Sequence, residues 1–118
     1  MRIKKVSAAE VPMDDFPFDT KVHSGKPVTK GSVSFQTRDK RMSGGVWSCT
    51  AGVFDWTYTG DEMIYILEGE AYIEEESGAR HHLRAGDTCF CATGWTAKWT
   101  VPKYIKKVFV LRTAEPLG

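Results

Sequence analysis

The chain has 118 residues, and its 16 Lys and Arg nearly cancel its 15 Asp and Glu, which leaves a formal net charge of +1. This length allows one domain, which buries roughly two-thirds of the surface of the unfolded chain. The balanced charge gives no general attraction to nucleic acid or to an anionic membrane. No apolar h-region follows the N-terminal lysines, and no apolar run approaches the ~20 residues of a membrane span. We therefore expect a cytoplasmic protein that binds neither nucleic acid nor membrane.

The first 30 residues are expected to form an irregular arm, because Pro12, Pro17 and Pro27 interrupt any regular pattern. Two aromatic residues of this arm, Phe16 and Phe18, need an apolar surface. We expect the arm to pack across its own barrel or across a partner subunit.

Residues 31–118 read as a series of short strands separated by turn residues. No segment keeps a helical period for more than a turn or two. Seven or eight short strands at this spacing predict a single all-β domain, a sandwich or a small barrel of the jelly-roll type. The expected strands cover residues 32–37, 45–52, 54–59, 63–76, 80–87, 88–93, 96–101 and 104–112.

The segment 56–69 has the spacing of a known motif: a ligand, one residue, a ligand, three residues, Glu, six residues, Gly. Glu62 and Gly69 match its second half. A second motif begins with Gly86 and continues to Gly94. On these residues the chain resembles the cupin superfamily. The resemblance implies a jelly-roll barrel with double Greek-key topology over about residues 45–111.

Residues 45–70 and 94–101 look like one cupin subfamily, the cupin domain of (S)-ureidoglycine aminohydrolase, which is similar to the ethanolamine-utilisation Q-type proteins. In the aminohydrolase, histidines and a carboxylate hold a manganese ion. The resemblance places the carboxylate at Glu62. It places the histidine positions at Trp56, Tyr58 and Ala97, where this chain has no imidazole.

Strand alternation and the motif spacing direct a set of aromatic residues and one carboxylate into the barrel. The mouth of such a barrel is a favoured ligand site. The alternative is that the tryptophans only fill the core. Glu62 and Tyr58 are the candidate catalytic residues. The predicted ligand-binding set is Trp47, Trp56, Tyr58, Glu62, Trp95 and Trp99, with Ala97 and Cys49 on the same faces.

Three roles remain open for Glu62. It binds a divalent metal (Mn, Fe, Ni or Zn) together with water, it forms a hydrogen bond with Tyr58, or it acts as a general acid or base whose pKa is moved by burial. A catalytic metal site usually has about three protein ligands, and only one is present here. We therefore expect no cofactor.

The remaining polar clusters are expected to be structural or solvent-exposed. Cys89 and Cys91 share one strand face and should be small packing residues, since no second Cys or His pair completes a zinc site. His81 and His82 should point to opposite faces and lie at the surface. The basic runs 38–41 and 106–108 should be solvated.

Three functions follow as hypotheses. The first is a cytosolic protein that binds a small polar organic molecule in an aromatic cavity around Glu62, without a metal. The second is a metal-dependent hydrolase, lyase or isomerase of the aminohydrolase type that uses Glu62. The third is a non-catalytic module whose role is dimerisation or partner binding. In each case we expect a homodimer.

Overall fold

The computed structural model describes residues 3–16 and 19–117. Within these ranges every regular element is a β-strand, as expected from the sequence. None of the described residues form a helix long and apolar enough to span a membrane. The strands are β1 (Asp14–Asp15), β2 (Val22–Gly25), β3 (Thr29–Gln36), β4 (Met42–Thr57), β5 (Asp61–Glu75), β6 (Arg80–Arg84), β7 (Thr88–Cys91) and β8 (Thr96–Arg112).

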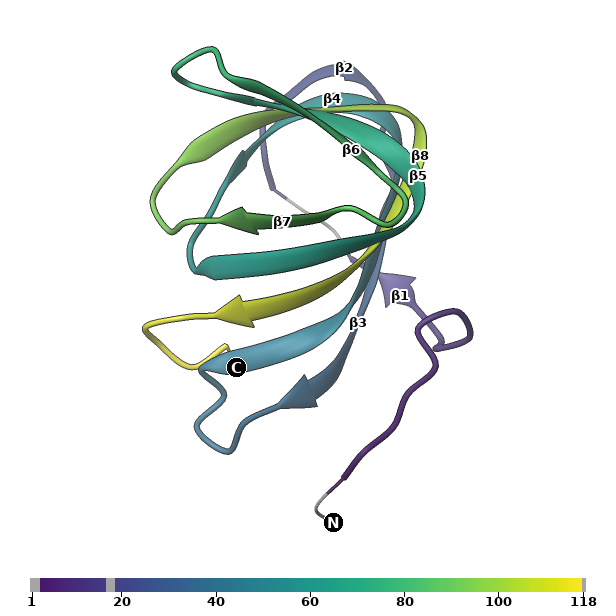
Figure 1. The fold of residues 1–118 in the computed structure, drawn as a ribbon, viewed down its shortest axis with the longest axis vertical. Coiled ribbons are helices and arrows are strands. Elements are labelled where there is room, and N and C mark those ends of the chain that lie inside the picture. Colours follow the sequence, from purple (N-terminus) through teal and green to yellow (C-terminus); the bar gives the residue numbers. More distant parts are fainter. Residues whose placement is uncertain (1–2, 17–18, 118) are drawn as a thin grey trace.

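The strands form a jelly-roll barrel. The main sheet has the order β1-β3-β4-β8-β5-β6, with β2 added beside β4 and β7 beside β5, and the pairings are antiparallel. Three long strands, β4, β5 and β8, bend sharply and pass through both halves of the barrel (Figure 1). The loops that join β4 to β5 and β7 to β8 lie together at the open side (Figure 1).

The strand break that we expected at Gly52 does not occur. β4 continues through this point, and its register with β8 shifts between Thr50 and Gly52. Such a bulge bends a strand without ending it. Gly52 is needed for a different reason: a Cβ there would lie 2.8 Å from the ring of Pro27. The glycine lets the N-terminal arm cross β4 closely.

The N-terminal arm is more regular than expected. It contributes β1, which pairs with β3, and β2, which pairs with β4. The ring of Phe16 packs over Gly31, where a Cβ would lie 3.2 Å from the ring, but Phe16 remains 40% exposed. Phe18, for which we also expected an apolar surface, lies outside the described residues.

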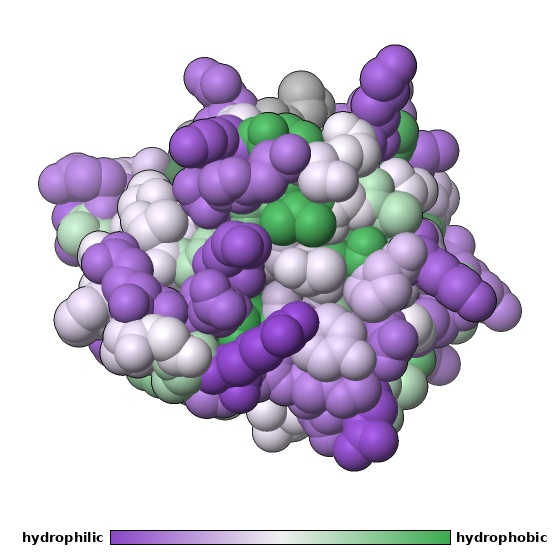
Figure 2. Space-filling model, turned by 90° about the horizontal axis from the view of Figure 1, so that it is seen from above, coloured by the Kyte–Doolittle hydropathy of each residue, from purple (hydrophilic) through white to green (hydrophobic). Residues whose placement is uncertain are grey.

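The core lies between the two halves of the barrel and is rich in aromatic residues. Trp99 is almost completely buried and stacks on Phe54, with ring centroids 6.2 Å apart. The edge of Trp47 also contacts Trp99, at 6.1 Å between centroids. Seen from above, the outer surface is mostly hydrophilic with a hydrophobic band near its centre (Figure 2). Two of the predicted ligand-binding tryptophans, Trp47 and Trp99, are therefore also core residues.

Candidate functional site

The six residues that we predicted to bind a ligand do not line one cavity. A small hollow of about 80 Å³ contains Trp47, Trp56, Trp99 and Glu62. A larger cavity of about 400 Å³ at the barrel mouth contains Tyr58 and Trp95. The strands thus separate the predicted site into an inner and an outer part, which differ in size and chemistry.

The inner hollow contains a buried ion pair that the sequence analysis missed. The Lys107 ammonium donates to Glu62 Oε2 at 2.7 Å, and the two side chains are only 7% and 8% exposed. We expected Lys107 to lie on a solvated face, and this expectation was wrong. The signal was present in β8, because Ile105 and Phe109 alternate with Lys107 and are buried or partly buried.

Aromatic rings enclose the Lys107 ammonium. It lies 4.7 Å from the ring centroid of Trp47 and 5.1 Å from that of Trp99. Contact with a ring face stabilises a cation most when both are desolvated, as they are here. The indole N–H of Trp47 is buried and has no hydrogen-bond partner among the described residues. The inner hollow is therefore a small, charge-compensated feature of the core, and the Trp47 N–H is a donor without a partner among the described residues.

Tyr58 does not pair with Glu62. Its hydroxyl oxygen accepts a hydrogen bond from Trp99 Nε1 at 3.0 Å, and the residue is 4% exposed. Burial, followed by the neighbouring Cys91, raises the pKa of Tyr58 well above its usual value. Tyr58 therefore remains a neutral phenol that separates the inner hollow from the outer cavity.

The residues around Glu62 do not fit the metal that the cupin resemblance implies. Trp56, Tyr58 and Ala97, at the histidine positions, offer no imidazole, and the Glu62 carboxylate is already held by Lys107. No group of three or more His, Cys, Asp or Glu in the described part of the chain is placed to hold a metal ion. The cationic partner of the carboxylate is thus a lysine side chain of the protein itself.

Trp95 is exposed at the mouth and does not face the barrel interior from a strand, as we had expected. It lies in the loop before β8 with 65% of its surface exposed, and it lines the outer cavity. Two backbone hydrogen bonds fix this loop, from Gly94 N to Tyr58 O at 2.7 Å and from Tyr58 N to Trp95 O at 3.0 Å. The side chain of Asp61 also accepts from Thr93. The rim that carries Trp95 is therefore well anchored.

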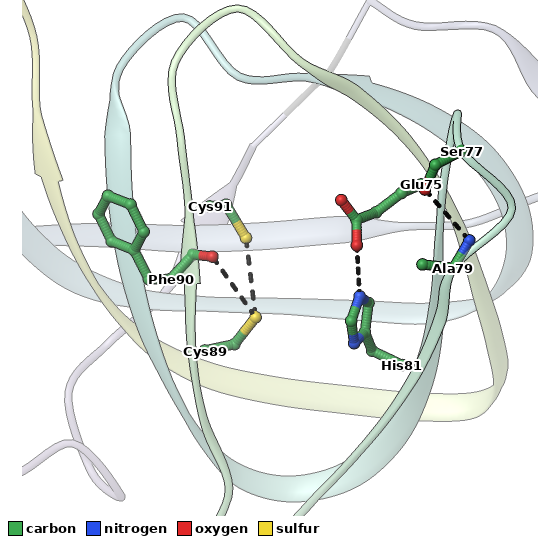
Figure 3. Close-up of polar contacts among 7 residues, drawn as sticks. All are labelled: Glu75, Ser77, Ala79, His81, Cys89, Phe90 and Cys91. Atoms are coloured by element: carbon green, nitrogen blue, oxygen red, sulfur yellow. Dashed lines mark hydrogen bonds and ion pairs between the residues drawn. The ribbon is translucent and has the colours of Figure 1, made fainter.

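Cys89 and Cys91 share one face of β7, as strand alternation predicted, and this face looks into the barrel. Their sulfur atoms are 3.9 Å apart, and both residues line the outer cavity (Figure 3). The hydrogen bond from Cys89, supported by one from Tyr58, lowers the pKa of Cys91 to about 7. The same bond raises the pKa of Cys89. Burial raises the pKa of Cys49 to about 12, so Cys49 remains an inert thiol.

The two histidines point to opposite faces, as expected. His81 pairs with Glu75 at 2.6 Å, and both residues line the outer cavity across from the cysteines (Figure 3). His82 lies on the outer face, pairs with Glu70 at 2.8 Å and stacks on Tyr72 at 4.3 Å. His81 is half exposed, so it is both a surface residue and a residue of the mouth.

The bent antiparallel barrel, the retained Glu and Gly motif residues and the inward aromatic cluster define a cupin domain. The family model described as EutQ-like cupin domain matches residues 36–109. The chain therefore belongs to the EutQ-like cupin family. Comparison with curated proteins gives no match.

Solved structures share the fold of this chain. The EutQ protein of Clostridium difficile is 25% identical, with a TM-score of 0.66 over 75% of this chain and 70% of that chain. A DUF861 protein of unknown function from Pseudomonas syringae is 22% identical, with a TM-score of 0.76. The match covers 86% of this chain but only 44% of that protein. The polyketide cyclase RemF of Streptomyces resistomycificus shares the fold, with 16% identity and a TM-score of 0.72 over 97% of this chain and 82% of that chain.

Proposed function

We propose that this protein binds a small organic molecule in the outer cavity at the barrel mouth, and that a metal ion takes no part in the binding. The observation that carries the proposal is the cavity itself. Its volume of about 400 Å³ lies within the range of small-molecule sites, whereas the inner hollow of about 80 Å³ is far below it.

The polar groups of the cavity favour a cationic ligand. Its lining contains the carboxylates of Glu75 and Glu76 but no Lys or Arg. Glu75 is paired with His81, while Glu76 makes no ion pair with any residue in the described ranges. The exposed face of Trp95 completes the arrangement, since an indole ring attracts an ammonium group. We therefore infer a small organic amine as the ligand class.

The inner pair has a supporting role in this proposal. Lys107 neutralises Glu62, so the cavity floor carries no excess charge. Tyr58, held by Trp99, forms the wall between the pair and the ligand. The aminohydrolase-type activity needs a metal at Glu62, and the residues at the ligand positions do not favour it.

Small amines are expected to raise the midpoint of thermal unfolding, because a ligand that binds only the folded state stabilises it. The measurement is a thermal shift with amines, carboxylates and ureides of similar size at millimolar concentration. Trp95→Ala should weaken amine binding about tenfold, from the loss of a cation–π contact of about 1–2 kcal/mol. Glu76→Gln should weaken it less, because an exposed ion pair contributes about 0.2–1 kcal/mol.

The matched controls are Tyr104→Ala and Glu74→Gln. Tyr104 is an exposed aromatic outside the cavity lining, and Glu74 is an exposed carboxylate next to Glu75 that also lies outside it. Neither change should alter binding. Stabilisation by carboxylates alone would contradict the ligand class, and no stabilisation by any compound of the panel would contradict the proposal.

A second candidate function, as a dimeric interaction module, is favoured by one observation. The outer face of β5 and β7 carries exposed apolar side chains: Met63 and Phe90, cross-strand neighbours, are each 62% exposed, and Tyr65 is 41% exposed. Apolar clusters of this kind commonly mark interfaces. We propose that a second copy of the chain covers this face.

Light scattering is expected to give a mass of twice 13.2 kDa for the protein and of one chain for Met63→Lys. The lysine places a charge at the centre of the proposed interface, where desolvation is costly. Lys98→Met, on a strand face away from this cluster, serves as the control and should remain a dimer. A monomeric wild-type protein would contradict the homodimer.

A further inference from the structure

The cysteine pair of β7 has a geometry that neither the cupin barrel nor the proposed amine site requires. Cys91 is paired with Glu62 of β5, and Cys89 is paired with Ile64, so both thiols lie on the face that looks into the barrel. Phe90, between them, points to the outside and is 62% exposed (Figure 3). Two soft ligands therefore converge in the same solvent-accessible cavity.

A direct disulfide between these residues is poorly matched to the strand. Two residues apart in an extended strand, the Cα atoms are separated by about 6.6 Å, close to the upper limit of about 6.8 Å for disulfides. The side chains also leave the strand in parallel directions. A single metal ion between the two sulfur atoms fits better. The sulfur atoms are 3.9 Å apart, a little less than the combined length of two metal–thiolate bonds of about 2.3 Å each. Small side-chain rotations are sufficient to complete the bridge.

We propose that Cys89 and Cys91 form a two-coordinate site for a soft monovalent cation of the Cu(I) class, bound between the two sulfur atoms. Thiolates select soft ions over the harder divalent ions. Two-coordination also agrees with the surroundings, since no third His, Cys, Asp or Glu in the described ranges completes a metal-binding group.

Binding of the ion is a ligand exchange without electron transfer. The cation and two thiols give a dithiolate complex with a charge of about −1, and up to two protons are released to solvent. The charged or titratable groups that face this site are Tyr58, Glu62 and Lys107, together with Glu75 and its partner His81 across the cavity. The Lys107 ammonium favours the anionic complex, whereas the carboxylates of Glu62 and Glu75 oppose it.

Anaerobic titration of the reduced, full-length protein with Cu(I) alone, in competition with a chromophoric chelator, tests the proposal. We expect one ion per chain. Cys89→Ser and Cys91→Ser should each weaken binding about a hundredfold or more, because one of two linked ligands is lost. Cys49→Ala is the matched control and should retain one ion, since Cys49 is fully buried and does not line the cavity.

Binding that survives Cys89→Ser, or that is lost equally in Cys49→Ala, would overturn the proposal. X-ray absorption of the wild-type complex provides a second readout that does not depend on the folding of any variant. Two sulfur neighbours support the site, and a shell of nitrogen or oxygen overturns it. The amine proposal is tested in copper-free protein, so either proposal can fail without the other.

Discussion

Lys107→Met is expected to lower the free energy of unfolding by about 3–5 kcal/mol, because it leaves the Glu62 carboxylate buried without a partner. The full penalty applies here, since the two side chains are only 7% and 8% exposed and their atoms are 2.7 Å apart. Urea denaturation at pH 7 provides the measurement. Lys106→Met is the matched control. Lys106 is the neighbouring residue on β8, it is only partly buried, and its replacement should cost less than about 1 kcal/mol.

The double variant Glu62→Leu/Lys107→Met distinguishes two effects: the loss of the attraction between Glu62 and Lys107, and the penalty of leaving one charge buried without a partner. Removal of both charges eliminates the unpaired group, and replacement of a buried pair by apolar side chains of similar volume is often neutral or stabilising. We therefore expect the double variant to be more stable than Lys107→Met alone. Additive losses, with the double variant the least stable of the set, would contradict the importance of the pair.

Gly69→Ala is expected to destabilise the protein by about 4 kcal/mol or more, a size that only severe backbone conflict or core disruption produces. A Cβ at this position would lie 1.8 Å from the carbonyl oxygen of Tyr104, and the backbone has a φ of +76°. The overlap involves main chain on both sides, so no side-chain rotation relieves it. The midpoint of urea unfolding measures the loss.

Gly78→Ala is the control for this prediction. Gly78 also has a positive φ, +93°, but no atom lies within 4 Å of an added Cβ. Its replacement should therefore cost only the left-handed backbone term of about 1–2 kcal/mol. If the two variants lost the same free energy of unfolding, the positive φ alone, and not the contact with β8, would explain why position 69 requires glycine.

The Glu62–Lys107 pair explains how a cupin barrel can keep its motif carboxylate without its motif histidines. A buried carboxylate needs a compensating charge or hydrogen bonds. In this protein the Lys107 ammonium supplies the compensating charge, and it lies over the rings of Trp47 and Trp99. The inner site is therefore a stabilising element, and this agrees with our proposal that a ligand binds in the outer cavity.

Several features of the site were predictable from sequence because they depend on local alternation. The shared face of Cys89 and Cys91 and the opposite directions of His81 and His82 follow from the two-residue period of a strand. The same rule applied to residues 105–109 would have placed Lys107 inside. The prediction for Lys107 was wrong because two adjacent lysines, Lys106 and Lys107, are typical of a solvated basic run.

Other features depended on the path of the chain. Trp95 follows Gly94, whose backbone has a φ of +92°. Trp95 therefore lies in the loop at the rim of the barrel, just before β8 begins at Thr96. The predicted ligand set is divided between an inner hollow and an outer cavity, and at their boundary Tyr58, just after β4, accepts a hydrogen bond from Trp99 of the neighbouring strand β8, 41 residues away. No periodic pattern within one segment contains that contact.

The sequence by itself determined the all-β barrel, the cupin family and the face of most of its inward residues, because each rests on short-range alternation and on motif spacing. Only the tertiary structure decided which inward residues meet. Glu62 and Lys107 are 45 residues apart, and their contact depends on the register and bending of β5 and β8. Strand register depends on packing and hydrogen bonding between distant segments. This register brings Lys107 of β8 next to Glu62 of β5.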